Sequence, residues 1–186
     1  MKALAKVLAI LVLTLLATAI ALRVLVFDLV EVRGDDMLPA LGKGAWVLVS
    51  RKGEPKRGDL ILYRGKDNTY HVRRVVALHG ERIQINDSRP IVMGKRATHE
   101  VTGTVRMADR TFKIVQESMD GRHYDILDDT MRRVTDQEEQ VVDGLFVMAD
   151  NREHSRDSRD GGSVPAENVR GIVVSVLARG AIPTQP

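Results

Sequence analysis

The sequence predicts a mainly β protein that is preceded by one N-terminal transmembrane helix. An uncharged apolar stretch lies close to the N-terminus, and short β-branched runs alternate with turn signals along the remaining chain. Of the 186 residues, 44% are apolar and 28% are charged, which suits one folded domain with room for a smaller lobe. The chain contains no cysteine, so disulfides, zinc thiolate sites and a cysteine nucleophile are excluded.

Charge and composition also exclude several kinds of partner. Lys and Arg number 28 and Asp and Glu 25, and this excess of +3 is too small to indicate nucleic acid binding. Aromatic residues make up 4% of the chain, which leaves few surfaces on which bases could stack. The five histidines lack the paired spacing of metal ligands. We therefore expect no nucleic acid partner, no metal and no cofactor.

The N-terminal segment has the length and composition of a membrane anchor. Residues 7–22 carry no charge, and a helix over residues 7–27 would be about 31 Å long, close to the bilayer core of about 30 Å. Arg23 would lie near one end of this helix, where its long side chain can reach the interface. Lys2 and Lys6 precede the segment, so the positive-inside rule places the N-terminus in the cytoplasm.

A cleaved secretory signal is the alternative interpretation. Residues 8–16 would be its apolar region, and Ala-Thr-Ala at residues 17–19 fits a small-x-small cleavage site. The apolar run continues beyond this site and resumes after Arg23, which favours a retained single-pass anchor over residues 1–28. Both interpretations place residues 29–186 outside the cytoplasm, on the far side of the cell membrane.

Ten short runs rich in β-branched residues are predicted to be strands. In chain order they are residues 45–50, 60–63, 71–76, 82–85, 90–93, 101–107, 111–116, 123–127, 145–148 and 172–176. Gly53 and Pro55 close the first run, Gly80 follows the third, and the turn residues at 86–88 signal a hairpin. Short strands at such regular spacing predict an all-β domain. Residues 129–140 are rich in charge and are interpreted as either a helix or a solvated loop.

Two stretches stand out from these runs. Residues 34–41 combine Gly, Asp and Pro, which taken alone indicates a turn. Residues 150–159 alternate acidic and basic side chains, which taken alone indicates a solvated loop. Both stretches gain a different meaning when they are considered with two further segments, residues 55–61 and 73–81.

Together these four segments resemble the sequence boxes of the bacterial type I signal peptidase family, the leader peptidases with a Ser–Lys dyad. Residues 34–41 resemble Gly-x-Ser-Met-x-Pro-x-Leu, and residues 55–61 resemble Pro-x-x-Gly-Asp followed by a hydrophobic residue. Residues 73–81 resemble Lys-Arg-Val-Val-Gly-Leu-Pro-Gly-Asp, and residues 149–159 resemble Gly-Asp-Asn-Arg-Asp-Asn-Ser-x-Asp-Ser-Arg. The order of the boxes behind an N-terminal anchor makes the resemblance specific, and it covers nearly the whole chain. It implies a signal-peptidase-like β catalytic core with a smaller β lobe at about residues 82–143.

The two positions that the resemblance assigns to catalysis carry the wrong residues. Family members cleave signal peptides with a Ser nucleophile just before Met-x-Pro and a Lys general base just before Arg-Val-Val. These positions are Asp36 and Arg73 here. Asp36 has no hydroxyl, and Arg73 stays protonated because the pKa of a guanidinium is above about 12. We therefore expect a catalytically silent member in which Asp36 and Arg73 form an ion pair.

The resemblance also assigns supporting residues. A Ser that often helps to hold the oxyanion in the family is replaced by Gly34, whereas Ser155 matches the Ser that binds the base. Asp157 and Arg159 match a structural charge pair beside the site. The supports of the site are thus expected to be retained although the reacting groups are replaced.

A substrate groove is expected beside Met37, His71 and Val72, although Met37 taken alone is a core residue and His71 a half-exposed strand residue. Such a protein would lie in the lipid bilayer, bind signal peptides or preproteins, and assist an active signal peptidase. Two alternatives stay open. One is an active endopeptidase in which Ser155 is the nucleophile and His71 the base, and the other is a structural membrane protein that serves another partner.

Overall fold

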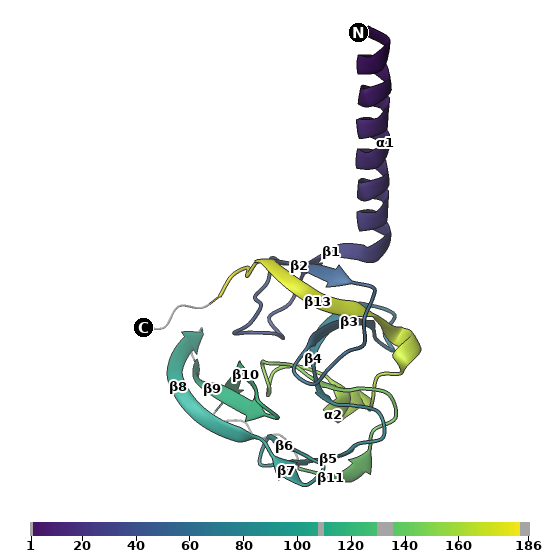
Figure 1. The fold of residues 1–186 in the computed structure, drawn as a ribbon. Helices are drawn as coiled ribbons and strands as arrows, with labels where there is room; N and C mark the ends of the chain where they lie inside the picture. Colours follow the sequence, from purple (N-terminus) through teal and green to yellow (C-terminus); the bar gives the residue numbers. More distant parts are fainter. Residues whose placement is uncertain (1, 108–109, 130–135, 183–186) are drawn as a thin grey trace.

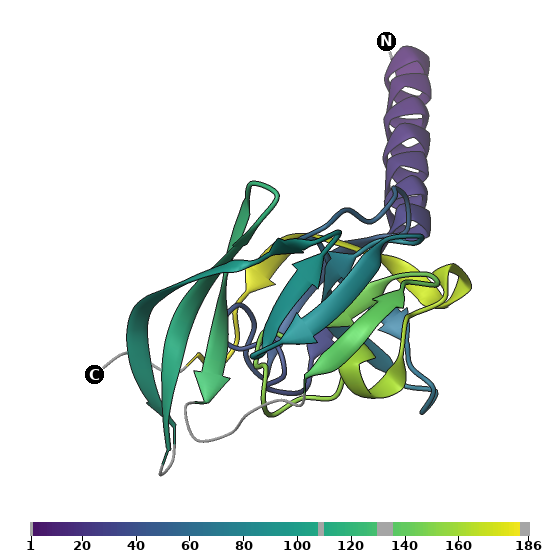
Figure 2. The same cartoon turned by 90° about the horizontal axis from the view of Figure 1, so that it is seen from below.

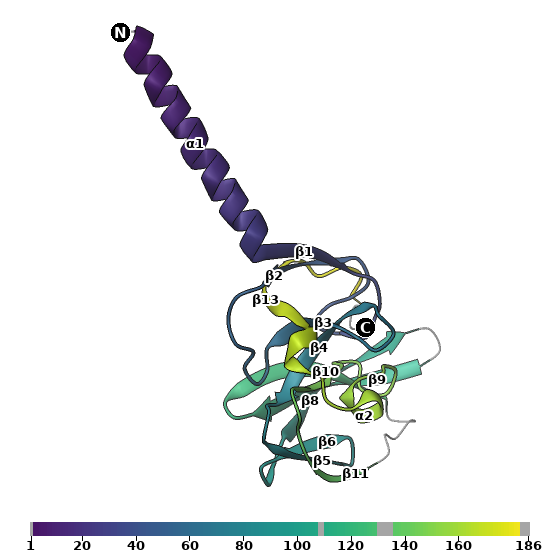
Figure 3. The same cartoon turned by 90° about the vertical axis from the view of Figure 1, so that its right-hand side faces the viewer.

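The computed structural model describes residues 2–107, 110–129 and 136–182. A long N-terminal helix, α1 (Lys2–Val26), rises from a body that consists of antiparallel sheets (Figure 1). Turning the molecule about the vertical axis shows that α1 leaves the body at the end formed by β1, β2 and β13 (Figure 3). The mainly β architecture is therefore confirmed.

The largest sheet has six strands in the order β1-β2-β13-β3-β4-β12. Their bounds are β1 (Phe27–Val32), β2 (Ala45–Ser50), β3 (Leu60–Arg64), β4 (Tyr70–Ala77), β12 (Phe146–Met148) and β13 (Val169–Ala178). In β2 the side chains of Ala45, Val47 and Val49 are buried while Trp46 is exposed, which is the alternation expected of a strand with one face on the core. The last strand of the chain, β13, pairs with both β2 and β3 and so lies in the middle of the sheet.

Two smaller sheets are built from residues between 82 and 141. One has three strands, β8 (Thr98–Met107), β9 (Arg110–Met119) and β10 (Arg122–Asp129), and stands to one side of the six-stranded sheet (Figure 2). The other has four strands, β5 (Arg82–Asn86), β6 (Arg89–Val92), β7 (Lys95–Arg96) and β11 (Gln137–Val141). The short helices α2 (Ser158–Gly161) and η1 (Ala166–Asn168) lie between β12 and β13 in the chain.

All ten predicted runs contribute to strands, and the hairpin expected at residues 86–88 joins β5 to β6. Its two turn residues, Asp87 and Ser88, have φ angles of 52° and 60°. Positive φ at both central positions is typical of the tight turns whose twist matches that of the flanking strands. Asp at the first of these positions tolerates the left-handed conformation better than most residues do.

Three strands were not predicted, namely β1, β7 and β11. Residues 24–27 were assigned to the anchor, whereas a strand begins at Phe27. The helix alternative for residues 129–140 is wrong where the structure describes them, because Asp129 ends β10 and Gln137 begins β11. Backbone pairing with β5 holds β11 although most of its side chains are exposed, and such pairing leaves little trace in composition. The remaining positions of this stretch lie outside the described residues.

The N-terminal segment forms a helix of 25 residues, in which Leu4, Val7 and Leu8 are among many exposed apolar side chains. Within the described parts of the chain, no helix combines the length and the apolar character that crossing a membrane requires. The transmembrane anchor expected over residues 1–28 is therefore not confirmed and stays a prediction. The division into an anchor, a domain over residues 29–186 and a lobe near residues 82–143 also stays a prediction.

Hydrophobic packing fixes the segment between β1 and β2. Met37 and Leu41 are 1% and 0% exposed and pack in a cluster with side chains of β2, β3 and β4. Leu38 packs in a second cluster with Phe112 and Leu127 of the three-stranded sheet. Because its apolar residues enter two clusters, this segment joins the two sheets and has little freedom to move.

Candidate functional site

Asp36 and Arg73 are 37 residues apart in the chain and lie side by side in the fold. Arg73 Nη2 donates to Asp36 Oδ2 at 3.1 Å, so the expected ion pair is present. The two side chains differ in exposure, which is 5% for Arg73 and 39% for Asp36. The guanidinium is thus part of the protein interior, and the carboxylate faces solvent.

The guanidinium of Arg73 is held mainly by backbone carbonyls. Its Nε and Nη2 donate to the carbonyl oxygen of Arg156 at 3.1 and 2.9 Å, and its Nη1 donates to the carbonyl oxygen of Val72 at 2.8 Å. With the bond to Asp36 these contacts use four of the five N–H groups that a guanidinium carries. Arg73 therefore joins β4 to the loop before α2 and to the segment that holds Asp36.

The backbone around Asp36 is fixed by residues 149–159, which we call the Asp-Asn-Arg box. The amide of Asn151 donates to the carbonyl oxygen of Asp36 at 2.9 Å, and Asn151 Nδ2 donates to the carbonyl oxygen of Asp35 at 3.2 Å. Asp35 Oδ1 in turn accepts from the amide of Lys43 at 3.2 Å. These bonds and the buried Met37 fix the backbone from which the half-exposed Asp36 side chain projects.

The interpretation of residues 150–159 as a solvated loop is wrong. Six of these residues are buried, namely Asp150, Asn151, Arg152, Glu153, Asp157 and Ser158. Two of the buried charges are paired with residues distant in the chain. Asp150 receives two bonds from Arg74 at 2.8 and 2.6 Å, and Arg152 donates two to Glu117 at 2.9 and 2.6 Å. Composition alone could not reveal these partners.

The pair of Glu117 and Arg152 stays charged inside the protein. Burial disfavours the carboxylate of Glu117, but the guanidinium of Arg152 and the ring of His99 outweigh this effect and lower its pKa to about 2. Tyr124 also donates to Glu117, at 2.7 Å. Because Glu117 and Tyr124 belong to the three-stranded sheet, this network ties that sheet to the box at residues 150–159.

Asp157 and Arg159 form a contact of 2.7 Å, as the resemblance implies. Asp157 also caps α2 and accepts from the amide of Ala149 at 2.8 Å. The hydroxyl of Ser155, by contrast, is buried and has no hydrogen-bond partner among the described residues. The bond that a Ser at this position is expected to make to the base is therefore missing, and Arg73 contacts the next carbonyl, that of Arg156.

A groove of about 710 Å³ leads to the Asp36–Arg73 pair. Its lining consists of Leu29, Val30, Glu31, Val32, Arg33, Gly34, Asp36, Met37, Leu62, Thr69, Tyr70, His71, Val72 and Arg73. The three residues expected to line it are all present. Gly34 supplies no side-chain donor, and a Cβ atom there would lie 3.4 Å from Asp36 Oδ2, which is ordinary contact.

Two strand edges border this groove. β1 is the first strand of the six-stranded sheet, so one of its edges is unpaired. The outer edge of β4 pairs with β12 only from Arg74 to Ala77, and no described strand pairs with residues 70–72 on that side. β1 was missed in the sequence because Asp28 and Glu31 interrupt its apolar residues directly after the helix. Asp28 is the first acidic residue after the apolar N-terminal segment, and this change in composition is the signal that could have located β1.

The ring of His71 contacts the side chains of two residues that lie just before it in the chain, Asp67 and Thr69. Its Nε2 lies 3.1 Å from Asp67 Oδ1 and 2.9 Å from Thr69 Oγ1. Hydrogen bonds from Thr69 and His71 lower the pKa of Asp67. In the part of the chain that the structure describes, no hydrogen bond joins His71 to Ser155, so the alternative nucleophile and base are not assembled.

The described residues also contain no group of three or more acidic or histidine side chains placed to hold a metal ion.

The structure is thus an antiparallel β fold with a surface groove, and Asp36 from residues 34–41 and Arg73 from residues 73–81 meet in its lining. The model of the family "Signal peptidase, peptidase S26" matches residues 4–178, so the chain belongs to this family.

Curated relatives agree with this assignment. The chain is 29% identical to signal peptidase I V of Bacillus subtilis over 159 residues, which cover 83% of this chain and 88% of the relative. It is 31% identical to signal peptidase I of Bacillus caldolyticus over 156 residues, covering 82% of this chain and 80% of the relative. A crystal structure of a signal peptidase I from Enterococcus faecalis overlaps with a TM-score of 0.41 at 21% identity, covering 66% of this chain and 98% of that one.

Proposed function

We propose that this signal peptidase family member binds exported peptides at the groove without cleaving them, as a membrane-anchored partner of protein export. The observation that carries the proposal is the ion pair of Asp36 and Arg73 at the positions that resemble the Ser–Lys dyad. Assistance to an active signal peptidase is the role that we infer for such a protein.

The chemistry of the pair opposes peptide cleavage. A Ser–Lys dyad needs a hydroxyl that loses its proton and a neutral amine that accepts it. The guanidinium of Arg73 has no proton acceptor, and the carboxylate of Asp36 is a weak nucleophile toward an amide. Gly34 also lacks the side-chain donor that would stabilise an oxyanion. Each of the three groups that the reaction uses is thus replaced by one that cannot perform its step.

The groove retains the features that peptide binding needs. The free edges of β1 and of residues 70–72 in β4 present backbone N–H and C=O groups along its sides. An extended peptide can add to such edges through main-chain hydrogen bonds, while apolar pockets accept alternate side chains. Val30, Leu62 and Val72 supply apolar lining of this kind. Binding would then need neither of the replaced catalytic groups.

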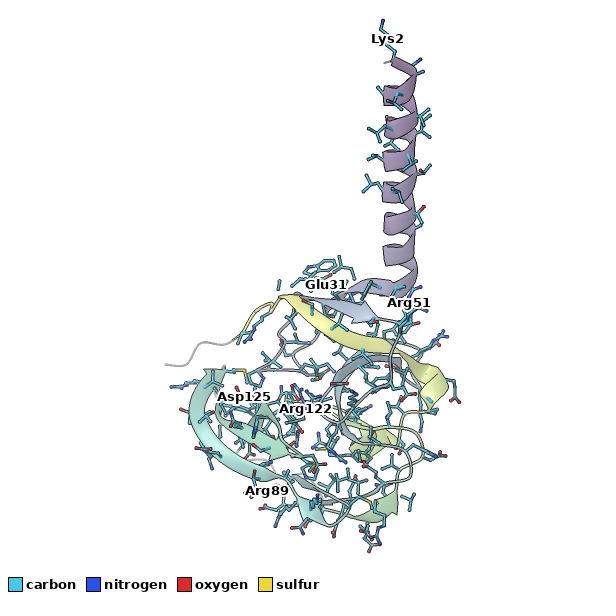
Figure 4. The ribbon with its side chains drawn as sticks, viewed as in Figure 1. Lys2, Glu31, Arg51, Arg89, Arg122 and Asp125 are labelled. Atoms are coloured by element: carbon cyan, nitrogen blue, oxygen red, sulfur yellow. The ribbon has the colours of Figure 1, made fainter. Side chains whose placement is uncertain are left out.

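Membrane attachment rests on α1 and on the strands at its base. The strands β1, β2 and β13 carry five exposed large apolar side chains, Leu29, Trp46, Val174, Val176 and Leu177. Glu31, which is opposite Trp46, lies at the end of the body from which α1 rises (Figure 4). An apolar surface beside an apolar helix is suited to a lipid surface. We infer a single-pass protein with its N-terminus in the cytoplasm and its β body outside.

A processing assay tests the proposed silence. The full chain, purified in detergent, is incubated with a preprotein from pH 5 to pH 10, and an active signal peptidase on the same preprotein serves as the positive control. We expect no mature product from this chain at any pH. Cleavage that disappears in Ser155→Ala or in His71→Ala would contradict the proposal and favour an active endopeptidase with unusual residues.

A further inference from the structure

We propose that Asp36 makes the groove selective for peptides that carry an ammonium group at the place where the family's scissile bond would lie. This inference rests on the proposed function, because it requires that the groove binds peptides. It assigns to Asp36 a role in choosing the ligand, in addition to its pairing with Arg73.

The first step concerns which group a ligand can reach. Four hydrogen bonds occupy Arg73, and its side chain is 5% exposed, so a ligand has almost no access to the guanidinium. Asp36 is 39% exposed and its Oδ2 accepts the bond from Arg73. Its other oxygen, Oδ1, accepts no hydrogen bond from the part of the chain that the structure describes. The polar atom offered to a ligand is therefore a carboxylate oxygen.

The second step concerns what this oxygen accepts. An ionised carboxylate is an acceptor only, so it attracts N–H groups and repels the carbonyl oxygens of a peptide. Hydrogen bonds to a charged partner are the stronger ones, which favours an ammonium over a neutral amide. A Ser hydroxyl at this position would instead tolerate a carbonyl group. The replacement by Asp36 therefore changes which ligand atom fits at the end of the groove.

The third step concerns the other charges of the groove. Glu31 and Arg33 are both exposed, carry opposite charges and lie two residues apart on the same edge. His71 is engaged by Asp67 and Thr69. Arg73 also lines the groove, but its side chain is 5% exposed, so the charged group that a peptide meets at the inner end of the groove is the carboxylate of Asp36.

Three peptides of the same eight-residue apolar sequence, all with an amidated C-terminus, test this selectivity. One is N-acetylated and neutral, one has a free α-amino group, and one is N-acetylated with a single central Lys. Fluorescence anisotropy with the full chain in nonionic detergent measures their affinities. We expect at least one of the two peptides that carry an ammonium group to bind about fivefold tighter than the neutral peptide. Comparing the peptide that has a free α-amino group with the peptide that has a Lys shows which kind of ammonium the groove prefers.

Asp36→Asn is the decisive variant because it keeps the shape and reverses the polarity. The N–H of Arg73 holds the amide oxygen inward, so the NH₂ group faces the groove as a donor. The advantage of the ammonium peptides should then disappear, whereas the matched change Asp143→Asn, at an exposed carboxylate outside the groove, should retain it. Melting curves verify that both variants fold.

Two results would overturn the inference and are distinguishable. Equal affinity of all three peptides for the unmodified chain would reject the selectivity while leaving peptide binding intact. Failure of all three peptides to bind would reject the proposed function, and the selectivity with it.

Discussion

At the end of the groove, the side chain of Arg73 makes more hydrogen bonds than the side chain of Asp36. Arg73 is bonded to two carbonyl oxygens as well as to the carboxylate, whereas the side chain of Asp36 has Arg73 as its one hydrogen-bond partner in the described chain. The guanidinium therefore acts as a cross-link between segments, and the carboxylate acts as its counter-charge. Because the two side chains differ in their hydrogen bonds, substitutions of Asp36 and of Arg73 should change the free energy of unfolding by different amounts.

Replacing Arg73 by Ala should destabilise the fold more than replacing Asp36 by Ala. Exposed pairs contribute about 0–1 kcal/mol and breaking a buried pair costs about 3–5 kcal/mol, so we expect about 1–2 kcal/mol for Asp36→Ala and about 2–4 kcal/mol for Arg73→Ala. Urea denaturation followed by circular dichroism measures both. The double variant should lose less than the sum of the two single losses, and strict additivity would show that the pair contributes no coupling.

Restoring the family's reacting groups should restore weak cleavage. Asp36→Ser together with Arg73→Lys supplies a hydroxyl and an amine beside Ser155, whose hydroxyl has no partner among the described residues. The missing donor at Gly34 should hold the rate about 10²-fold below that of the triple variant with Gly34→Ser, for which there is room. A preprotein processing assay measures this.

The two single variants, Asp36→Ser and Arg73→Lys, are the matched controls of this experiment and should remain inactive. If the restored dyad also cleaves nothing, then either the groove no longer holds a preprotein in register or the assignment of the two positions to the dyad is mistaken.

Among the elements, the strands were predictable and their contacts were not. Period-two patterns and turn residues located ten strands because these signals lie within a few adjacent residues. β1 escaped because it follows the helix without a turn signal, and the burial of residues 150–159 escaped because Arg152 pairs with Glu117. The positions of Asp36 and Arg73 followed from the resemblance, but the bonds of Arg73 to the Arg156 carbonyl required the fold.

The contact between β10 and the Asp-Asn-Arg box should make stability depend on pH. Glu153 accepts from the amide of Asp129 at 3.0 Å, and its other oxygen is buried without a partner in the described chain. Burial raises the pKa of Glu153 from 4.5 to about 7, and the negative charge of Asp128 acts in the same direction. The hydrogen bond from Asp129 and the positive charges of Arg152 and Arg159 lower this pKa but do not outweigh burial. The folded state therefore binds more protons between these pH values, and stability falls as the pH rises from about 4.5 to about 7.

Glu153→Gln tests this dependence because the amide cannot ionise. We expect the variant to be more stable than the unmodified chain by on the order of 1–3 kcal/mol at pH 8, with the difference shrinking toward pH 4. Urea denaturation at several pH values measures it, and Glu100→Gln on exposed β8 serves as a neutral control. A difference that is the same at pH 4 and pH 8 would contradict the role of Glu153.

At the scale of the whole molecule, the orientation of the β body depends on α1. The apolar run that continues beyond residues 17–19 and the exposed apolar side chains at the base of the helix are the grounds on which we predict retention in the membrane. We expect the protein to stay with membranes through alkaline washing and to keep Met1 or Lys2 as its N-terminus. N-terminal sequencing that finds Ile20 in a soluble fraction would instead identify residues 1–19 as a cleaved signal.

The cross-link made by Arg73 also bears on the two mutational routes that lead from this chain to a Ser–Lys dyad. Arg73→Lys as a first change keeps a cation opposite Asp36, but an ammonium cannot reproduce the fork of bonds that the guanidinium makes to the carbonyls of Val72 and Arg156. Asp36→Ser as a first change keeps the bonds to the carbonyls but leaves the buried guanidinium without its anion. Neither intermediate has both reacting groups. The two routes thus weaken the cross-link in different ways, and the proposed silent state lies two changes away from a Ser–Lys dyad.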